Sequence, residues 1–185
     1  MRPSVCLRIV SAPAAWLPAL VVFSALAAGP VRAQDVGGIE VGSRAPAIAA
    51  TDLAGRAVRL AVAADHKPAL VEFWATWCEY CARLEPRMKQ VYARYGGRVQ
   101  FLAVAVNVNE SLARVAGHTR SHSLPFQVVY DASGSATRDY DVPATSFVVV
   151  ADATGRITYT GLGDQQDLEA ALRHVVEPQH PGGLP

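Results

Sequence analysis

The stretch FWATWCEYCARLEP, residues 73 to 86, constrains this chain more than any other feature, because it places two cysteines three residues apart. A disulfide stabilises a fold largely through the loop entropy that it removes, and a bridge between Cys78 and Cys81 closes almost no loop. A closed zinc site needs four ligands, and no second cysteine pair accompanies this one. We therefore interpret the pair as a redox reagent, with a structural disulfide and half of a zinc site as the alternatives.

The N-terminal residues 1–33 have the pattern of a secretory signal peptide. Arg2 and Arg8 precede the apolar run AWLPALVVFSALAAG, and small residues stand before Gln34, where cleavage is expected. The apolar run is shorter than the roughly 20 residues that span a bilayer, which disfavours the alternative of an uncleaved membrane anchor. The sequence thus predicts an exported protein, periplasmic in a cell with two membranes.

Loss of residues 1–33 changes the count of cysteines and charges. Cys6 leaves with this segment, so Cys78 and Cys81 are the only cysteines of the exported chain. That chain carries 14 basic and 16 acidic residues, a net charge of −2, which gives no support for a nucleic-acid partner. The predicted organisation is a cleaved signal peptide at 1–33, a flexible leader at 34–41, one domain at 42–177 and a disordered tail at 178–185.

Strand and helix patterns alternate along the predicted domain. ALVEFW, residues 69 to 74, is apolar with one charge, which is typical of a strand covered on both faces. Apolar residues at helical spacing follow, and Gly96 and Gly97 end that helix. The other expected elements are a β-hairpin within 42–60, strands at 99–106 and 126–130, helices at 109–122, around 133–140 and at 164–176, and a hairpin formed by 145–150 and 157–160.

Several of these motifs together resemble the thioredoxin fold: FWATWCxxC after a buried strand, a proline five residues beyond the second cysteine, and Val-Pro-Ala-Thr before a returning hairpin. The leader GSRAPAIAATDLAGRAVRL and the insertion between VQFLAVAV and FQVVY resemble the TlpA/ResA group of exported thiol-disulfide oxidoreductases. The resemblance covers about residues 42 to 176. It implies an α/β fold of thioredoxin type, with three α/β/α layers, a central mixed sheet and an N-terminal β-hairpin extension.

The resemblance also implies an activity and partners. Proteins of this group reduce disulfides in other exported proteins, apocytochromes and copper-site proteins among them, and a membrane thiol-disulfide electron donor keeps them reduced. We therefore expect a reductase whose partners are cysteine-containing exported proteins and such a donor. The Cys78–Cys81 disulfide is the only redox group expected, with no further cofactor.

The position of the cysteines assigns their roles. A thiol attacks as its thiolate, which a helix N-terminus stabilises through oriented N–H groups. Cys78 stands where strand gives way to helix, so we expect it to attack the substrate, and Cys81, one turn inside, to resolve the mixed disulfide.

Glu72, the one charge in ALVEFW, stands where thioredoxin carries a buried acid, and we expect it to exchange a proton with Cys81. TlpA/ResA proteins often use a helix glutamate instead. The matching place here holds Leu84, with Glu85 one residue later and rotated away. Glu72 is therefore the predicted proton acceptor, and Glu85 is the alternative.

Five residues are predicted to meet the substrate: Trp77, Glu79, Tyr80, Val142 and Pro143. Acidic Glu79 beside the helix start should disfavour the thiolate, which favours a reductant over a strong oxidant. By the resemblance, Pro143 matches a cis-proline loop that faces the cysteines, which implies a cis bond and a Val142 backbone free to pair with an extended substrate.

Other functions are open at this point. A disulfide-forming oxidant shares the motif, and a copper-delivery protein could bind Cu(I) through Cys78, Cys81 and a histidine. A thiol peroxidase of related fold fits less well, because Thr76 stands two residues before the cysteine instead of three. His118 and His122 have metal-ligand spacing, but no third ligand accompanies them in the sequence, so we predict no metal site.

Overall fold

The computed structural model describes residues 37–177. The predicted signal peptide, residues 34–36 of the leader and the predicted tail at 178–185 lie outside the described residues, and the predictions for them stay predictions. Within the described part of the chain, no helix combines the length and apolar character that a membrane span requires.

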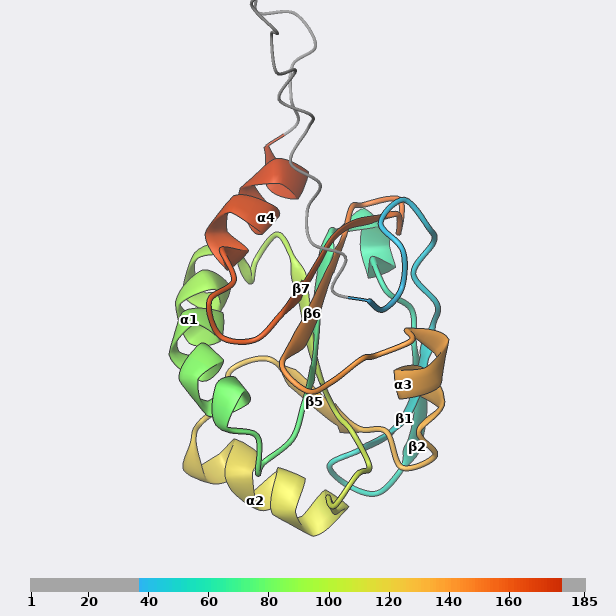
Figure 1. The fold of residues 1–185 in the computed structure, drawn as a ribbon, viewed down its shortest axis with the longest axis vertical. Helices are drawn as coiled ribbons and strands as arrows, with labels where there is room; N and C mark the ends of the chain where they lie inside the picture. The colour runs from blue at the N-terminus through green and yellow to red at the C-terminus, as the bar shows by residue number, and fades with distance from the viewer. Residues whose placement is uncertain (1–36, 178–185) are drawn as a thin grey trace, which may run out of the picture. The chain divides into compact units, whose positions relative to one another are not determined.

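One mixed sheet of seven strands forms the centre of the domain, in the order β2-β1-β5-β4-β3-β6-β7 (Figure 1). The bounds of the strands are Ile48–Asp52 (β1), Ala57–Leu60 (β2), Ala69–Trp74 (β3), Gln100–Ala105 (β4), Gln127–Tyr130 (β5), Phe147–Ala151 (β6) and Ile157–Leu162 (β7). Strands β3, β4 and β5 run parallel, whereas β6, β7 and the hairpin of β1 and β2 pair antiparallel.

Helices cover both faces of this sheet. They are α1 (Glu79–Tyr95), α2 (Leu112–Ser121), α3 (Ser135–Asp139) and α4 (Leu168–Val176), and a short 3-10 turn, Ala64–His66, precedes β3. Figure 1 shows α1, α2 and α4 on one side of the sheet and α3 on the other. The predicted three-layer α/β/α fold with an N-terminal β-hairpin extension is therefore confirmed.

Strand β3 lies at the middle of the core. All six of its residues are buried, because β4 and β6 flank it in the sheet and helices cover its two faces. Phe73 packs against the rings of Tyr140 and Phe147, with centroids 5.1 Å and 6.4 Å away. Since β3 ends at Trp74 and α1 begins at Glu79, the carboxyl end of a fully buried strand leads directly to the two cysteines.

The described part of the leader contacts this core. The N–H of Ile39 donates to the carbonyl of Tyr140 over 2.9 Å. Gly38 adopts a φ of +91°, and a Cβ built there would lie 2.4 Å from the Phe147 ring, so only glycine fits this approach.

Two helices begin later than their sequence patterns predict. Helix α4 begins at Leu168 instead of Asp164, because the side chain of Asp167 accepts the N–H of Ala170 as an N-cap. Asp164 instead binds Arg83 of α1 over 2.6 Å. Helix α2 begins at Leu112, after Ser111, whose side chain caps the N–H of Arg114 in the same way.

Candidate active site

Cys78 and Cys81 lie at the start of α1 and form a disulfide. Cys78 is the N-cap residue of the helix, and its Sγ accepts a hydrogen bond of 3.1 Å from the backbone N–H of Cys81. The first N–H groups of a helix have no partner inside it, so a sulfur at this place meets donors that favour its anionic form. Cys78 is 5% exposed and Cys81 4%, so the position at the helix start, and not exposure, supports Cys78 as the attacking thiol.

A small cavity lies beside the disulfide. Its volume is about 20 Å³, which is room for one water molecule. The residues that line it are Glu72, Trp74, Ala75, Thr76, Cys78, Cys81, Ala82, Glu85, Ala103, His118, Leu124 and Phe126. The structure thus brings the predicted Glu72 together with both cysteines. A larger groove, of about 490 Å³, lies between α1 and α4, and no cysteine lines it.

Glu72 points from β3 into an environment with few polar partners. It is 5% exposed, and within residues 37–177 its carboxyl group forms no hydrogen bond. Burial, and secondly the negative charge of Glu85, raise the pKa of Glu72 to about 8. The carboxyl group is therefore mostly protonated at neutral pH and holds a proton beside the cysteines.

Trp74 supplies a second unpaired polar group to the cavity wall. Its indole Nε1 is buried and has no hydrogen-bond partner among the described residues. An N–H donor in this setting costs free energy unless something accepts its hydrogen. A water molecule in the cavity is a suitable acceptor, because the cavity has the right size and polar groups line it.

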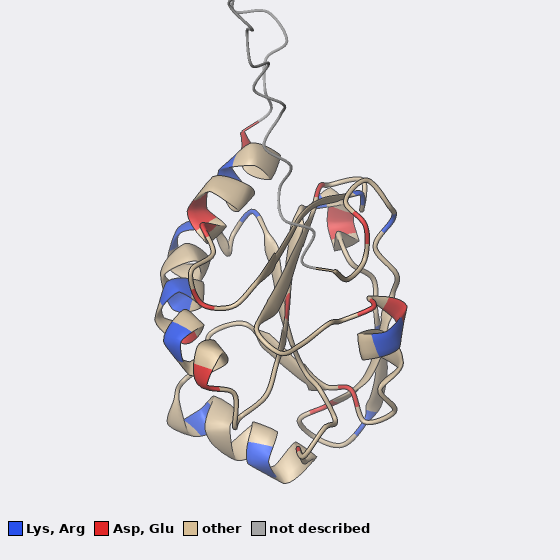
Figure 2. Cartoon of the chain, viewed as in Figure 1, with Lys and Arg blue, Asp and Glu red and all other residues tan. Residues whose placement is uncertain are grey.

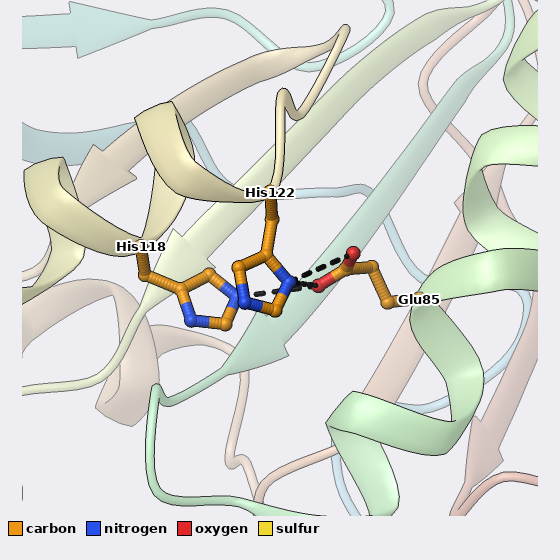
Figure 3. Close-up of side chains that lie close together, drawn as sticks. All are labelled: Glu85, His118 and His122. Atoms are coloured by element: carbon orange, nitrogen blue, oxygen red, sulfur yellow. Dashed lines mark hydrogen bonds and ion pairs between the residues drawn. The ribbon is translucent and has the colours of Figure 1, made fainter.

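Glu85 lies on the same cavity, which corrects the prediction that it is rotated away from the cysteines. It follows Cys81 by four residues, and side chains at that spacing share one face of a helix. Its carboxylate pairs with Lys89 Nζ at 2.8 Å. It also accepts His118 Nε2 at 3.2 Å and His122 Nδ1 at 2.9 Å, as Figure 3 shows. Burial by itself raises the pKa of Glu85, but these hydrogen bonds outweigh it and lower the pKa below its usual value.

Glu110 fixes the loop that precedes the cysteines, and sequence reasoning missed it. Its side chain accepts the N–H of Thr76 over 2.7 Å, the N–H of Ser111 over 2.8 Å and Nε of Arg114 over 3.0 Å. Burial by itself raises the pKa of Glu110, but these hydrogen bonds lower it overall. Trp77 adds a second tie between the two loops, because its Nε1 donates to the carbonyl of Val108 over 2.9 Å.

The predicted surface residues around Cys78 are accessible. Trp77 is 49% exposed and Tyr80 is 55% exposed, and the guanidinium of Arg83 lies 4.6 Å from the centre of the Tyr80 ring. Glu79 forms an ion pair of 2.8 Å with Arg83, and its side chain is 84% exposed. Water and Arg83 therefore both weaken the effect of the Glu79 charge on Cys78.

The loop before β6 differs from its prediction in two ways. No cis peptide bond occurs within residues 37–177, so the Val142–Pro143 bond is trans, the isomer that X-Pro bonds favour, and the prediction of a cis bond is wrong. The N–H of Val142 already donates to Thr137 over 3.0 Å, so it is not free to pair with a substrate. The end of the loop is fixed to β3, because the N–H of Ser146 donates to the carbonyl of Phe73, but Val142 and Pro143 do not line the cavity beside the cysteines.

Known proteins share both the sequence pattern and the fold. The family model described as Redoxin matches residues 40–174. A thiol-disulfide oxidoreductase ResA from Geobacillus kaustophilus is 32% identical over 142 residues, which cover 74% of this chain and 79% of that protein.

Two solved structures share the fold. A hypothetical protein from Sinorhizobium meliloti matches with a TM-score of 0.69 at 24% identity, covering 80% of this chain and 90% of that one. The thioredoxin domain of a thiol-disulfide oxidoreductase from Bacteroides vulgatus matches with a TM-score of 0.61 at 22% identity, covering 74% and 99%. At these identities the two structures bear on the fold alone.

Proposed function

This chain belongs to the Redoxin family and is a thiol-disulfide oxidoreductase of the ResA/TlpA type, and from that premise we propose that it reduces disulfides in exported proteins. The observation that carries the proposal is the redox pair at the start of α1, beside a cavity that also holds a protonated carboxyl group. No other redox group is needed, because the two sulfurs can accept and give two electrons.

In the reducing direction, the Cys78 thiolate attacks one sulfur of a substrate disulfide. A new S–S bond joins Cys78 to the substrate, and the other substrate sulfur leaves as a thiolate. The Cys81 thiol then loses its proton and attacks Cys78 Sγ, which releases the second substrate thiol and forms the intramolecular disulfide. Two electrons pass from the protein to the substrate, and the electron donor later reverses the sequence on the Cys78–Cys81 bond.

Glu72 is the proton partner of Cys81 in this scheme. As a carboxylate it accepts the proton of the Cys81 thiol when that sulfur attacks, and it is left as the neutral acid. When the donor opens the disulfide, the neutral acid returns the proton to the departing Cys81 thiolate. Its raised pKa supports this role, because a group that titrates near pH 8 can hold or release a proton near neutral pH.

The direction of electron flow depends on how strongly the Cys78 thiolate is stabilised. A strongly oxidising pair stabilises its reduced thiolate heavily. Here Cys78 Sγ accepts one hydrogen bond within the described residues, burial opposes its charge, and the neighbouring Glu79 is acidic. These features favour a reductant.

Export and partners follow from the N-terminal pattern and the surface. Residues 1–33 have the features of a signal peptide, which supports a periplasmic or other extracytoplasmic location. Trp77, Glu79 and Tyr80 border Cys78 and form the surface that we expect a substrate to cover. We propose cysteine-containing exported proteins as substrates, apocytochromes or copper-site proteins among them, and a membrane thiol-disulfide carrier as the electron donor.

The proposal is tested by trapping substrates on a Cys81→Ser variant of the exported chain. Without the resolving thiol, mixed disulfides on Cys78 should accumulate, and a Cys78→Ser variant, the matched control, should trap none. Absence of trapped partners on an intact, accessible Cys78 would sink the mechanism. Equilibration of the wild-type pair with glutathione then measures the potential, and a strongly oxidising value would make the protein an oxidant instead.

A further inference from the structure

We propose that Glu85, His118 and His122 form a binding site for one divalent transition-metal ion of the Zn²⁺ type. Glu85 lies on α1, whereas His118 lies on α2 and His122 is the C-cap residue directly after α2, 33 and 37 residues further along the chain. The proposal does not depend on the proposed direction of electron flow, and it involves neither cysteine.

The distances suit a metal ion. All three ligand atoms lie within 4.8 Å of one another, and Glu85 Oε2 is 3.2 Å from His118 Nε2 and 2.9 Å from His122 Nδ1. Ligands bound to Zn²⁺ at about 2.0–2.2 Å in a tetrahedron stand about 3.3 Å apart. A shift of a few tenths of an ångström would therefore open the pairs around Glu85 to tetrahedral spacing.

The nitrogens face the carboxylate from one side. Figure 3 shows the two imidazole rings extending from α2 and its end toward Glu85. The rings stack with centroids 3.8 Å apart and an interplanar angle of 20°, so both imidazoles present an edge to the same carboxylate. Neutral imidazole and carboxylate are the ligands that Zn²⁺ takes in two-histidine, one-glutamate sites, with water in the fourth position.

The surroundings permit entry and hold the ligands. The side chain of His122 is 44% exposed, so an ion can reach the site from solvent. Trp74 packs against His118 at 5.1 Å between ring centroids, which limits the movement of that imidazole. Lys89 pairs with Glu85 Oε1 at 2.8 Å, an oxygen that His122 Nδ1 also approaches at 3.1 Å, and the positive charge of Lys89 opposes a bound cation.

The same contacts could serve only as an ion-pair network around Glu85, and metal binding separates the two cases. An ion bridging Glu85 to His118 and His122 would link α1 to α2 and would stabilise the folded state in proportion to its occupancy. A simple ion-pair network would give no response to added Zn²⁺. The cavity beside the cysteines shares Glu85 and His118 with this site, so the ion would lie next to the redox pair.

The test is calorimetric titration of the oxidised exported chain with Zn²⁺, because the disulfide removes both thiols as ligands. We expect one ion per chain and a rise in the unfolding temperature on binding. His122→Gln should weaken binding by more than the roughly 10–100-fold that loss of an outer-shell partner costs. His118→Gln and Glu85→Gln should act in the same direction.

His174→Gln, at an exposed histidine of α4, is the matched control and should leave the affinity unchanged. Lys89→Met should tighten binding several-fold, because it removes the opposing charge. Circular dichroism of each variant confirms that it folds. The proposal is overturned if the oxidised wild-type chain binds no Zn²⁺, or if His122→Gln binds it as well as the wild type.

Discussion

Two buried glutamates on either side of the cysteine loop have opposite chemistry. Glu72 comes from the middle of β3, makes no hydrogen bond within the described residues, and has a pKa raised to about 8. Glu110 follows β4, accepts hydrogen bonds from Thr76, Ser111 and Arg114, and has a lowered pKa. Both are at most 9% exposed, so burial alone does not decide whether a carboxyl group keeps its proton.

The difference lies in the partners. A buried carboxylate that accepts several N–H donors is stabilised as the anion, whereas one without donors keeps its proton. Glu110 therefore stays ionised and holds the loop before Cys78 in place through its hydrogen bonds. Glu72 keeps its proton up to about pH 8 and gives it up above that pH, which is what a proton partner of Cys81 requires.

The largest expected effect is on the pH dependence of stability through Glu72. Because the pKa of Glu72 is higher in the folded than in the unfolded chain, the folded state keeps this proton over a range of pH in which the unfolded chain has lost it. Below pH 4.5 both states are protonated and Glu72 does not lower stability. As the pH rises from 4.5 toward 8, the free energy of unfolding falls. Glutamine does not titrate, so Glu72→Gln should not show this fall. The difference in free energy of unfolding, variant minus wild type, should therefore increase by on the order of 4 kcal/mol between pH 4.5 and 8. Denaturant unfolding of both proteins at several pH values measures this difference. If the two plots of unfolding free energy against pH run parallel, Glu72 has an ordinary pKa and the prediction is wrong.

The next effect is a loss of stability on replacing Glu110. Glu110→Gln keeps the shape of the side chain but leaves some of its three donors without an acceptor, which should cost about 2–3 kcal/mol at neutral pH. The same experiment on Glu72→Gln should show no comparable loss. Equal destabilisation by the two substitutions would contradict the distinction between them.

For Glu110 the pH dependence of stability is expected to run the other way, with stability lost as the pH falls. A lowered pKa contributes stability that is present above the usual pKa of 4.5 and is lost as the pH falls through the folded-state value. Glu110→Gln should therefore lose less stability than the wild type on acidification, by about 1.4 kcal/mol for each unit by which the pKa is lowered. Acid unfolding monitored by tryptophan fluorescence checks this. If the variant loses as much stability at low pH as the wild type, the Glu110 carboxylate does not have this role.

A surface glutamate of the same loop region should have the smallest effect. Glu79 is exposed and pairs with Arg83 in water, and Figure 2 shows that α1 carries several other Lys and Arg residues. Glu79→Gln should leave the free energy of unfolding unchanged within error and should shift the reduction potential only slightly. A large change in potential would mean that Glu79 acts on Cys78 despite its exposure.

The sequence predicts the residues of this site that lie on one strand and the following helix. It does not predict the contacts between residues that are distant in the chain. Glu72 could be predicted as a buried acid, because it is the single charge in the apolar strand ALVEFW. The cysteines could be predicted as the redox pair, because they stand where that strand gives way to a helix. Glu110 binds Thr76, which lies 34 residues before it, and Glu85 meets His118 across 33 residues, so no local pattern joins them. The spacing of Cys81 and Glu85 was the one available signal, because residues four apart share a helix face.

The proposed transfer of the Cys81 proton to Glu72 is tested by the rate at which a labelled thiol leaves its mixed disulfide with Cys78. If Glu72 accepts the proton, this rate should rise with pH and level off above about 8 in the wild type and in Glu110→Gln. Glu72→Gln should be roughly 100-fold slower at neutral pH and should go on rising at higher pH. The same rate and the same levelling in Glu72→Gln would contradict the claim.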